Sequence, residues 1–273
     1  MTPTIFLATD YGHDDEFVGV LHAVIARLAP SARVIDLSHG IAAFDVAGGA
    51  ALLERAAPYL GDGVVCAVVD PGVGGTRRAV AIEVASAPRY LVGPDNGLLC
   101  WAAAALGGVV RAVELSSEPV RFVGSTTFDG RDVFAPAAAR LASGVALDDL
   151  GRVLDASSLV TLPEPHVATR SLEDGRVVLT GSVRWIDRFG NVQLSLPGRL
   201  LEGVSAAGVA VRGDDTLVRV VGSYAALEPG APGLLADANG AVALVVREGS
   251  AASRFEVTVG DRVDLVGDFG SRR

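Results

Sequence analysis

The stretch VVDPGVGGTRRAV, residues 68–80, combines an acid, a glycine-rich corner and two arginines. A glycine-rich corner after an apolar run is typical of phosphate-binding loops. This one lacks the Gly-Lys-Ser/Thr ending of a P-loop, and it carries Asp70 where an anion would bind. Because side chains alternate along a strand, Arg77 and Arg78 should point to opposite faces, so only one of them can reach Asp70. The pattern predicts a loop in which an acid and a guanidinium act together.

Three further clusters of acidic or amide side chains follow apolar runs. They are Asp10 in TDYGHDD, the segment GPDNGLL at 93–99, and Asp129 with Asp132 in TTFDGRDVFAP. An aspartate at such a place is more often a helix cap or a turn residue, so each cluster alone is weak evidence of function. Open α/β sheets bind their ligands at strand ends, and the four clusters together therefore indicate a site.

Alternating strands and helices must position these clusters. Helices are expected over 14–30, over 45–60 and from near Arg131, and strands at 4–8, 33–37, 64–69, 79–84, 90–92 and 109–115. Asp14 and Asp15 are expected to cap the first helix. Apolar runs such as VVCAVV, residues 64–69, are typical of strands covered by helices on both sides. Residues 1–162 are therefore predicted to form a three-layer α/β domain with a mostly parallel sheet.

The pattern changes after residue 162. Residues 163–175 carry two prolines and charged side chains without apolar periodicity, which predicts a linker. From 176 to 273 short apolar segments alternate with glycine turns, and no helix is expected. The expected strands lie in RVVLTGSVRWI, NVQLSL, AAGVAVRG, TLVRVV, AVALVVREG, RFEVTV and DRVDLV. This part is predicted to be an all-β, barrel-like domain.

Composition excludes several classes of function. A formal net charge of −9 and an isoelectric point near 4.9 argue against nucleic-acid binding. The apolar stretch GLLCWAAAALGGVV is too short to cross a membrane, and the N-terminus has no basic region typical of a signal peptide. Cys66 and Cys100 lie in apolar runs and are expected to be free thiols of a cytoplasmic protein. The four histidines show no metal-ligand spacing, so no metal site is expected.

Six motifs in order resemble one family. TDYGHDDEFVGVLHAVI, HGIAAFDVAGGA, VVDPGVGGTRRAVAI, VGPDNGLL, FDGRDVFAPAAARLASG and WIDRFGNVQLSL are similar to motifs of the S-adenosylmethionine (SAM) hydroxide adenosyltransferases, which are adenosyl-forming SAM hydrolases. Fluorinase and chlorinase are halide-using relatives. The resemblance implies hydrolysis of SAM by water attack at ribose C5′, giving adenosine and L-methionine. It implies no cofactor, and a homotrimer in which SAM lies between the N-terminal domain of one subunit and the C-terminal domain of its neighbour.

The resemblance also implies roles for residues that would bind the substrate. Asp10 would hold the two ribose hydroxyls, since a carboxylate can accept both protons of a cis-diol. Phe44 would cover the ribose and sulfonium. In the β domain, Asp187 would contact the methionine ammonium, and Asn239 the methionine carboxylate. Phe189 and Tyr224 would stack on the two faces of adenine. Asn191 and the backbone from Val246 to Glu248 would contact the adenine edge and complete its binding.

Three residues are implied to act on the water. Asp70 and Arg77, seven residues apart as in the family, would position it. Asp129 stands where the hydrolases usually have histidine, and it could act as a base or leave the site slow. Ala238 and Asn239 likewise replace hydroxyl or basic groups of the family pattern.

Two alternatives to hydrolysis follow from these residues. Because Asp129 replaces the usual histidine, one alternative is that the chain is a SAM- or adenosine-binding protein with weak or no turnover. A halide-dependent adenosyl transferase is disfavoured, because the Asp70 carboxylate would repel a halide ion.

Overall fold

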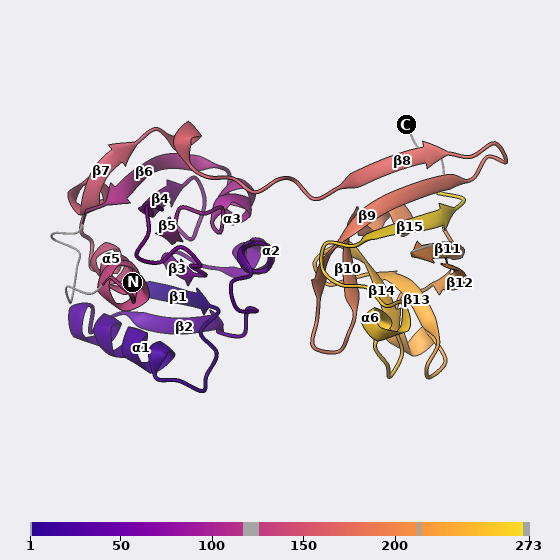
Figure 1. Ribbon diagram of the computed structural model, residues 1–273, viewed down its shortest axis with the longest axis horizontal. Coiled ribbons are helices and arrows are strands. Elements are labelled where there is room, and N and C mark those ends of the chain that lie inside the picture. The colour runs from indigo at the N-terminus through magenta and orange to yellow at the C-terminus, as the bar shows by residue number, and fades with distance from the viewer. Residues whose placement is uncertain (1, 117–125, 212–213, 270–273) are drawn as a thin grey trace. The chain divides into compact units, whose positions relative to one another are not determined.

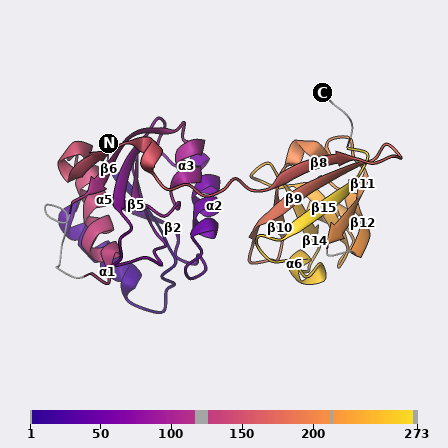
Figure 2. The same cartoon turned by 45° about the horizontal axis from the view of Figure 1, so that its top comes forward.

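The computed structural model describes residues 2–116, 126–211 and 214–269. The chain divides into two compact units, Met1–Leu162 and Pro163–Arg273, which are described separately. Figures 1 and 2 show an α/β sheet in the first unit and a β-barrel in the second. The predicted fold class is confirmed.

A seven-stranded sheet forms the centre of the N-terminal unit. Its strands are β1 (Thr4–Thr9), β2 (Arg33–Ser38), β3 (Val64–Val68), β4 (Ala79–Val84), β5 (Tyr90–Pro94), β6 (Val109–Leu115) and β7 (Gly151–Leu154). Their order is β2-β1-β3-β5-β4-β6-β7. The β2–β1, β1–β3 and β3–β5 pairs are parallel, while β4 is antiparallel to β5 and β6, and β7 is antiparallel to β6. All strands except β4 and β7 therefore run in one direction.

Helices cover both faces of this sheet. They are α1 (Phe17–Leu28), α2 (Val46–Ala56), α3 (Cys100–Ala105) and α5 (Ala135–Ala142). In β1, Ile5 and Leu7 pack with α1 and α5, whereas Phe6 and Ala8 pack with α2 and α3. Figure 2 shows the two helical layers on opposite sides of the strands. The apolar runs are buried on both faces, as a sheet between two helical layers requires.

The start of α1 differs from the prediction. The helix begins at Phe17, its N-cap residue is Glu16, and no side chain makes a capping hydrogen bond. Asp14 and Asp15 lie before the helix, so the predicted caps are wrong. Helix α2, in contrast, has a side-chain cap, because Asp45 Oδ1 accepts a hydrogen bond of 2.8 Å from the Gly48 N–H. Helix α3 was not predicted from the sequence pattern.

The C-terminal unit is a closed barrel of seven strands with β8 added outside it. Its strands are β8 (Val167–Ser171), β9 (Val177–Ile186), β10 (Val192–Pro197), β11 (Ala206–Val211), β12 (Asp214–Val220), β13 (Pro232–Ala236), β14 (Ala241–Val246) and β15 (Arg262–Gly267). The order is β10-β14-β13-β12-β11-β15-β9-β8, and pairing of β9 with β10 closes the ring. Closure pairs the edges that an open sheet would expose.

Three predictions for this unit need correction. Strand β8 falls inside 163–175, which was predicted to be a linker; all its side chains are exposed, so it shows no apolar pattern. The expected strand RFEVTV, from residue 254, instead contains the end of a short helix, α6 (Ala251–Arg254), followed by a turn. Strand β13 was not predicted. Residues 212–213, the end of the expected strand AAGVAVRG, lie outside the described residues.

No helix among the described residues is long and apolar enough to cross a membrane.

The two contrasting helix starts give a paired test of capping. We expect Asp45→Ala to lower the free energy of unfolding by about 1 kcal/mol, because it removes the acceptor for the Gly48 N–H. Asp14→Ala is the control, and we expect it to change stability by less than about 0.5 kcal/mol. Urea unfolding followed by circular dichroism measures both. Equal losses in the two variants would contradict the assigned cap.

Candidate active site

Asp70 and Arg77 are joined across the glycine corner that follows β3. Arg77 Nε donates to both carboxylate oxygens of Asp70, at 2.9 Å and 3.0 Å, and Arg77 Nη2 also contacts Asp70 Oδ2. Arg78 points the other way and pairs with Asp95. The two arginines, which lie just before β4, therefore point in opposite directions, and Arg77 is the partner of Asp70.

Asp129 completes this cluster from a distant part of the chain. Arg77 Nη2 donates to Asp129 Oδ2 at 2.5 Å, so one guanidinium bridges two carboxylates. The side chains of Asp70, Arg77 and Asp129 are only 6 %, 14 % and 8 % exposed. Burial opposes the charge of Arg77, but the hydrogen bonds that it donates to the two carboxylates outweigh this effect and raise the pKa of the guanidinium. The guanidinium also lies 5.3 Å from the centre of the buried Phe134 ring.

Two glycines allow the segments around the cluster to approach one another. Gly74 has a φ of +74°, and a Cβ there would lie 2.6 Å from the carbonyl oxygen of Thr126. A Cβ on Gly130 would lie 2.3 Å from the Tyr11 hydroxyl. A π-helical turn, Gly130–Phe134, follows Asp129 directly and leads into α5. Close backbone approach thus brings the corner after β3, the end of β1 and the start of α5 together.

Asp129 faces two cavities. The larger, of about 850 Å³, is also lined by Asp10, Phe44 and Asp70, while the smaller, of about 220 Å³, is lined by Arg77. Asp129 Oδ1 is buried and has no hydrogen-bond partner among the described residues. A buried acceptor of this kind is ordinarily satisfied by water or a ligand. The cluster therefore presents its carboxylates to the larger cavity, and Arg77 lies behind them.

Asp10 and Phe44 lie together at the larger cavity. The Phe44 N–H donates to Asp10 Oδ2 at 2.9 Å, which orients the carboxylate. Phe44 has a φ of +68°, a conformation unfavourable for a bulky side chain, and its side chain is 71 % exposed. Backbone strain at an exposed aromatic residue is typical of a binding site.

An aromatic wall of the same cavity was missed from the sequence. The rings of Tyr11, Phe17 and Phe128 pack edge to face, with centroids 5.2–5.7 Å apart. Burial and the charges of nearby groups, which include Asp10 and Asp70, raise the pKa of Tyr11, so its phenol stays protonated. The sequence contains one signal for this aromatic wall: Tyr11 directly follows Asp10, and Phe128 directly precedes Asp129.

Two of the acidic positions singled out in the sequence have structural partners. Asp95 binds Arg78 and accepts a hydrogen bond from the Val160 N–H at 2.8 Å, which ties the end of β5 to a later segment. Asp132 is fully buried and pairs with Arg131 at 2.8 Å. Neither lines the larger cavity.

The barrel has an open pocket of about 710 Å³ that collects most of the expected β-domain residues. They are Asp187, Phe189, Asn191, Tyr224, Val246 and Glu248. Phe189 and Tyr224 are 69 % and 45 % exposed, so both rings are accessible to a ligand. Burial and the charges of Asp187 and Asp237 raise the pKa of Tyr224. Asn239 lies in the β13–β14 turn and is not among the residues lining this pocket.

Asp187 and Asn191 shape one side of this pocket. Asp187 Oδ1 accepts from the N–H groups of Phe189 and Asn191, at 2.8 Å and 2.9 Å. Asp187 Oδ2 accepts from the Asn191 side-chain amide at 2.7 Å. Gly190 has a φ of +83°, and a Cβ there would clash with Ser250. The turn therefore fixes the direction in which Phe189 projects, and the oxygens of Asp187 retain lone pairs for a further donor.

Comparison with known proteins places these features in one family. The N-terminal domain model of the SAM hydroxide adenosyltransferases matches residues 5–151, and the C-terminal domain model matches residues 181–264. An (R)-S-adenosyl-L-methionine hydrolase from Salinispora tropica is 48 % identical over 96 % of this chain and 97 % of its own length. The crystal structure of an uncharacterized conserved protein from Thermotoga maritima is similar with a TM-score of 0.85 and 31 % identity, covering 96 % of this chain and 99 % of that one.

A more distant match is a fluorinase from Actinoplanes, which is 27 % identical over 70 % of each chain.

The bridge through Arg77 predicts which second substitution restores the stability that is lost when Arg77 is replaced. We expect Arg77→Gln to lower the free energy of unfolding by about 3 kcal/mol, because two buried carboxylates then lack their shared cation. Adding Asp70→Asn should restore part of the stability.

Arg78→Gln is the matched control for this experiment. It breaks the separate pair with Asp95, so Asp70→Asn should not rescue it. Denaturant unfolding measures all variants. Rescue of both arginine variants, or of neither, would contradict the bridged cluster.

Proposed function

Because the chain belongs to the SAM hydroxide adenosyltransferase family, we propose that it hydrolyses S-adenosyl-L-methionine to adenosine and L-methionine. The observation that carries this proposal is the pair of buried carboxylates, Asp70 and Asp129, held by Arg77 at the wall of an 850 Å³ cavity. The Salinispora tropica protein is named for the (R) sulfonium isomer, and we propose that isomer as the preferred substrate.

The reaction needs a positioned water more than it needs acid catalysis. The water oxygen forms a bond to ribose C5′ while the C5′–S bond breaks, and its electron pair passes to sulfur. Sulfur leaves as the neutral thioether of methionine, so it takes no proton and the step draws on no cofactor. The water loses one proton, which a carboxylate can accept and pass to solvent. Alignment of the water with the C–S bond is therefore the main task of the site.

Asp129 and Asp70 are suited to hold this water. Asp129 Oδ1 is an acceptor without a hydrogen-bond partner among the described residues, at a cavity that Asp70 also lines. Arg77 contacts both carboxylates but does not line that cavity, so we assign it a positioning role. With two acids and one base, the cluster keeps a net negative charge. That charge attracts a sulfonium and repels a halide ion, which favours hydrolysis over halide transfer.

The remaining roles divide between the two units. In the N-terminal unit, Asp10 is proposed to accept hydrogen bonds from the ribose hydroxyls, and Phe44 to cover the sugar. In the barrel, the exposed rings of Phe189 and Tyr224 are proposed to stack on adenine. Asp187, Asn191 and the Val246–Glu248 backbone would supply polar contacts to the ligand. The amide of Asn239 remains a candidate contact for the methionine carboxylate.

We also propose that the protein is a homotrimer in which one subunit's N-terminal unit and its neighbour's barrel share each SAM molecule. The support is that each unit carries an open pocket with half of the required groups: carboxylates in one, exposed aromatic rings in the other. A cytoplasmic location is proposed because Cys66 and Cys100 are free thiols. Burial raises the pKa of the Cys66 thiol to about 12, so it is inert.

Incubation of the protein with SAM tests the reaction, with adenosine and methionine followed by chromatography. We expect adenosine to form without added halide, and the (R) isomer to be consumed first. Asp70→Asn should lower turnover at least about tenfold while SAM binding, measured by calorimetry, is retained. Asp62→Asn is the control, because Asp62 is exposed and lies before β3, at the strand end opposite Asp70.

Three results would contradict this assignment. Tight binding of SAM without product would favour a binding protein, and chloro-deoxyadenosine formed in salt would favour a halide transferase. Full activity of Asp70→Asn would remove that carboxylate from the mechanism.

Shared sites predict complementation between inactive variants. Phe189→Ala should weaken activity about tenfold or more by removing an exposed stacking ring without disturbing the core. When Asp70→Asn and Phe189→Ala subunits are co-expressed, about a quarter of the sites in random trimers combine two intact halves. We therefore expect activity near that fraction of wild type, and a trimer by analytical ultracentrifugation. Once hydrolysis by the wild-type protein is established, activity no greater than the mean of the two variants would show that sites are not shared.

A further inference from the structure

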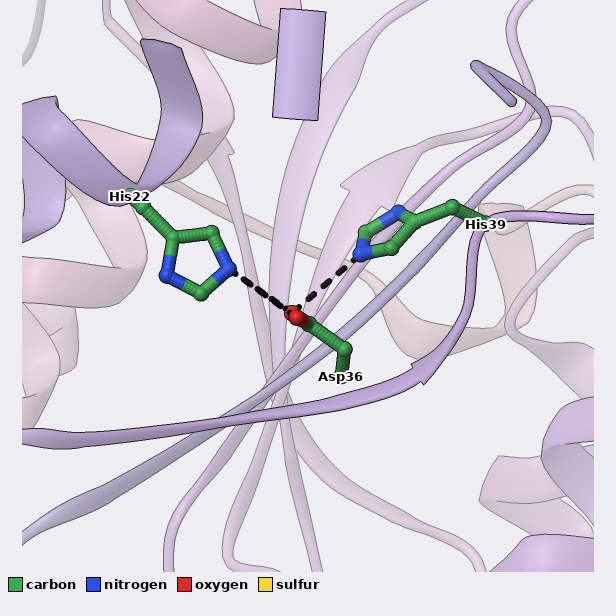
Figure 3. Close-up of side chains that lie close together, drawn as sticks. All are labelled: His22, Asp36 and His39. Atoms are coloured by element: carbon green, nitrogen blue, oxygen red, sulfur yellow. Dashed lines mark hydrogen bonds and ion pairs between the residues drawn. The ribbon is translucent and has the colours of Figure 1, made fainter. Parts of the chain in front are cut away.

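A cluster of two histidines and an aspartate lies outside the candidate active site. His22 comes from α1, Asp36 from β2, and His39 from the segment after β2 (Figure 3). His22 Nε2 lies 2.9 Å from Asp36 Oδ1 and 3.2 Å from Oδ2, and His39 Nε2 lies 3.2 Å from Asp36 Oδ1. Their ligand atoms all lie within 4.8 Å of one another. Figure 3 shows both imidazole rings directed at the carboxylate.

An ion pair with Asp36 alone does not explain the burial and the hydrogen bonding of His39. Its side chain is 1 % exposed, and its Nε2 has no hydrogen-bond partner among the described residues, although Asp36 Oδ1 is only 3.2 Å away. The two atoms lie at the distance of an ion pair. A buried ring nitrogen that is directed at a carboxylate and has no hydrogen-bond partner of its own can share a third atom with that carboxylate.

The other nitrogen of His39 is held as in a metal-binding histidine. His39 Nδ1 lies 2.8 Å from Oγ1 of the buried Thr9. Metal-ligating histidines usually engage their second ring nitrogen in a hydrogen bond, which fixes the ring and directs the free lone pair to the metal. The Tyr11 N–H also donates to Thr9 Oγ1, at 3.2 Å, so the supporting hydroxyl is itself fixed. On the solvent side, His22 and Asp36 are 36 % and 39 % exposed, which gives an ion access.

We propose that His22, Asp36 and His39 bind a divalent transition-metal ion of the Zn²⁺ class. Two imidazole nitrogens and one carboxylate oxygen form a donor set that Zn²⁺ prefers, with a fourth position for water on the exposed side. Bonds of 2.0–2.2 Å in a tetrahedral site separate neighbouring ligand atoms by about 3.3 Å. Two nitrogen–oxygen separations in the cluster are already 2.9 Å and 3.2 Å, and all three ligand atoms lie within 4.8 Å of one another, so side-chain rotations can complete the site.

Metal binding here stabilises the segment that carries Asp10. The His39 carbonyl accepts a hydrogen bond of 2.8 Å from the Gly12 N–H, and the His39 ring contacts Thr9. Residues 9–12 are therefore attached to His39 at both ends, and Asp10 and Tyr11 between them line the larger cavity. An ion that fixes His39 also fixes this segment. The metal site does not depend on the proposed hydrolysis.

Spectroscopic titration of untagged, chelator-treated protein with Co²⁺ tests the site, with competition by Zn²⁺. We expect one equivalent of Co²⁺ to give the absorption of a tetrahedral site, and Zn²⁺ to displace it. His22→Gln should lower the affinity at least about tenfold. His166→Gln is the matched control, because His166 belongs to the other unit and should leave the titration unchanged. Zn²⁺ should raise the thermal midpoint of wild type and of the control, but less in His22→Gln.

Two outcomes would overturn the proposal. One is the lack of saturable binding at one equivalent in the wild-type protein. The other is equal affinity in His22→Gln and His166→Gln, which would place the ion elsewhere. Asp36→Asn provides a second, exposed substitution and should weaken binding in parallel with His22→Gln. Circular dichroism confirms that each variant is folded before titration.

Discussion

The bridge from Arg77 to Asp70 and Asp129 is the interaction on which the N-terminal site depends. Two buried carboxylates that share one partner repel each other unless a cation lies between them, and Arg77 is that cation. The requirement sets the local backbone: the corner after β3 must turn tightly enough to return Arg77 to Asp70, and the start of α5 must approach it. Gly74 and Gly130 meet this need, because a side chain at either would clash with the neighbouring segment.

The same bridge determines what the cavity can bind. Arg77 uses one carboxylate oxygen of Asp129 and leaves Oδ1 without a hydrogen-bond partner among the described residues. Arg77 does not line the larger cavity, so a ligand there meets carboxylates, the aromatic rings of Tyr11 and Phe128, and Arg131, whose charge is paired with Asp132. Negative charge beside aromatic surface suits a cation with an apolar body, and a sulfonium nucleoside is one. Asp129 thus leaves one carboxylate oxygen without a protein hydrogen bond among the described residues, at the wall of the cavity.

Local patterns in the sequence were sufficient for some of this arrangement. Alternation indicated that only one of Arg77 and Arg78 can reach Asp70, and continuous apolar runs indicated a sheet between two helical layers, because both signals depend on adjacent residues only. The choice of Arg77 rested instead on the seven-residue spacing that resembles the family. The contact between Arg77 and Asp129 joins residues 52 positions apart and has no local signal. Strand β8 was missed for a related reason, since its side chains are exposed and its existence depends on pairing with β9. The caps expected at Asp14 and Asp15 were wrong because the helix begins later than its acidic signal.

The segment after β2 connects the two sites of the N-terminal unit. It supplies His39, whose ring and carbonyl hold Thr9 and Gly12, and then Phe44, whose N–H orients the carboxylate of Asp10. Asp10 is therefore fixed through its backbone by one end of this segment and through its side chain by the other. Histidine spacing along the chain gave no hint of this, because His22, Asp36 and His39 converge only when α1 packs beside β2. A substitution that weakens the contacts of His39 must consequently make the position of Asp10 less fixed, although the two side chains belong to different clusters.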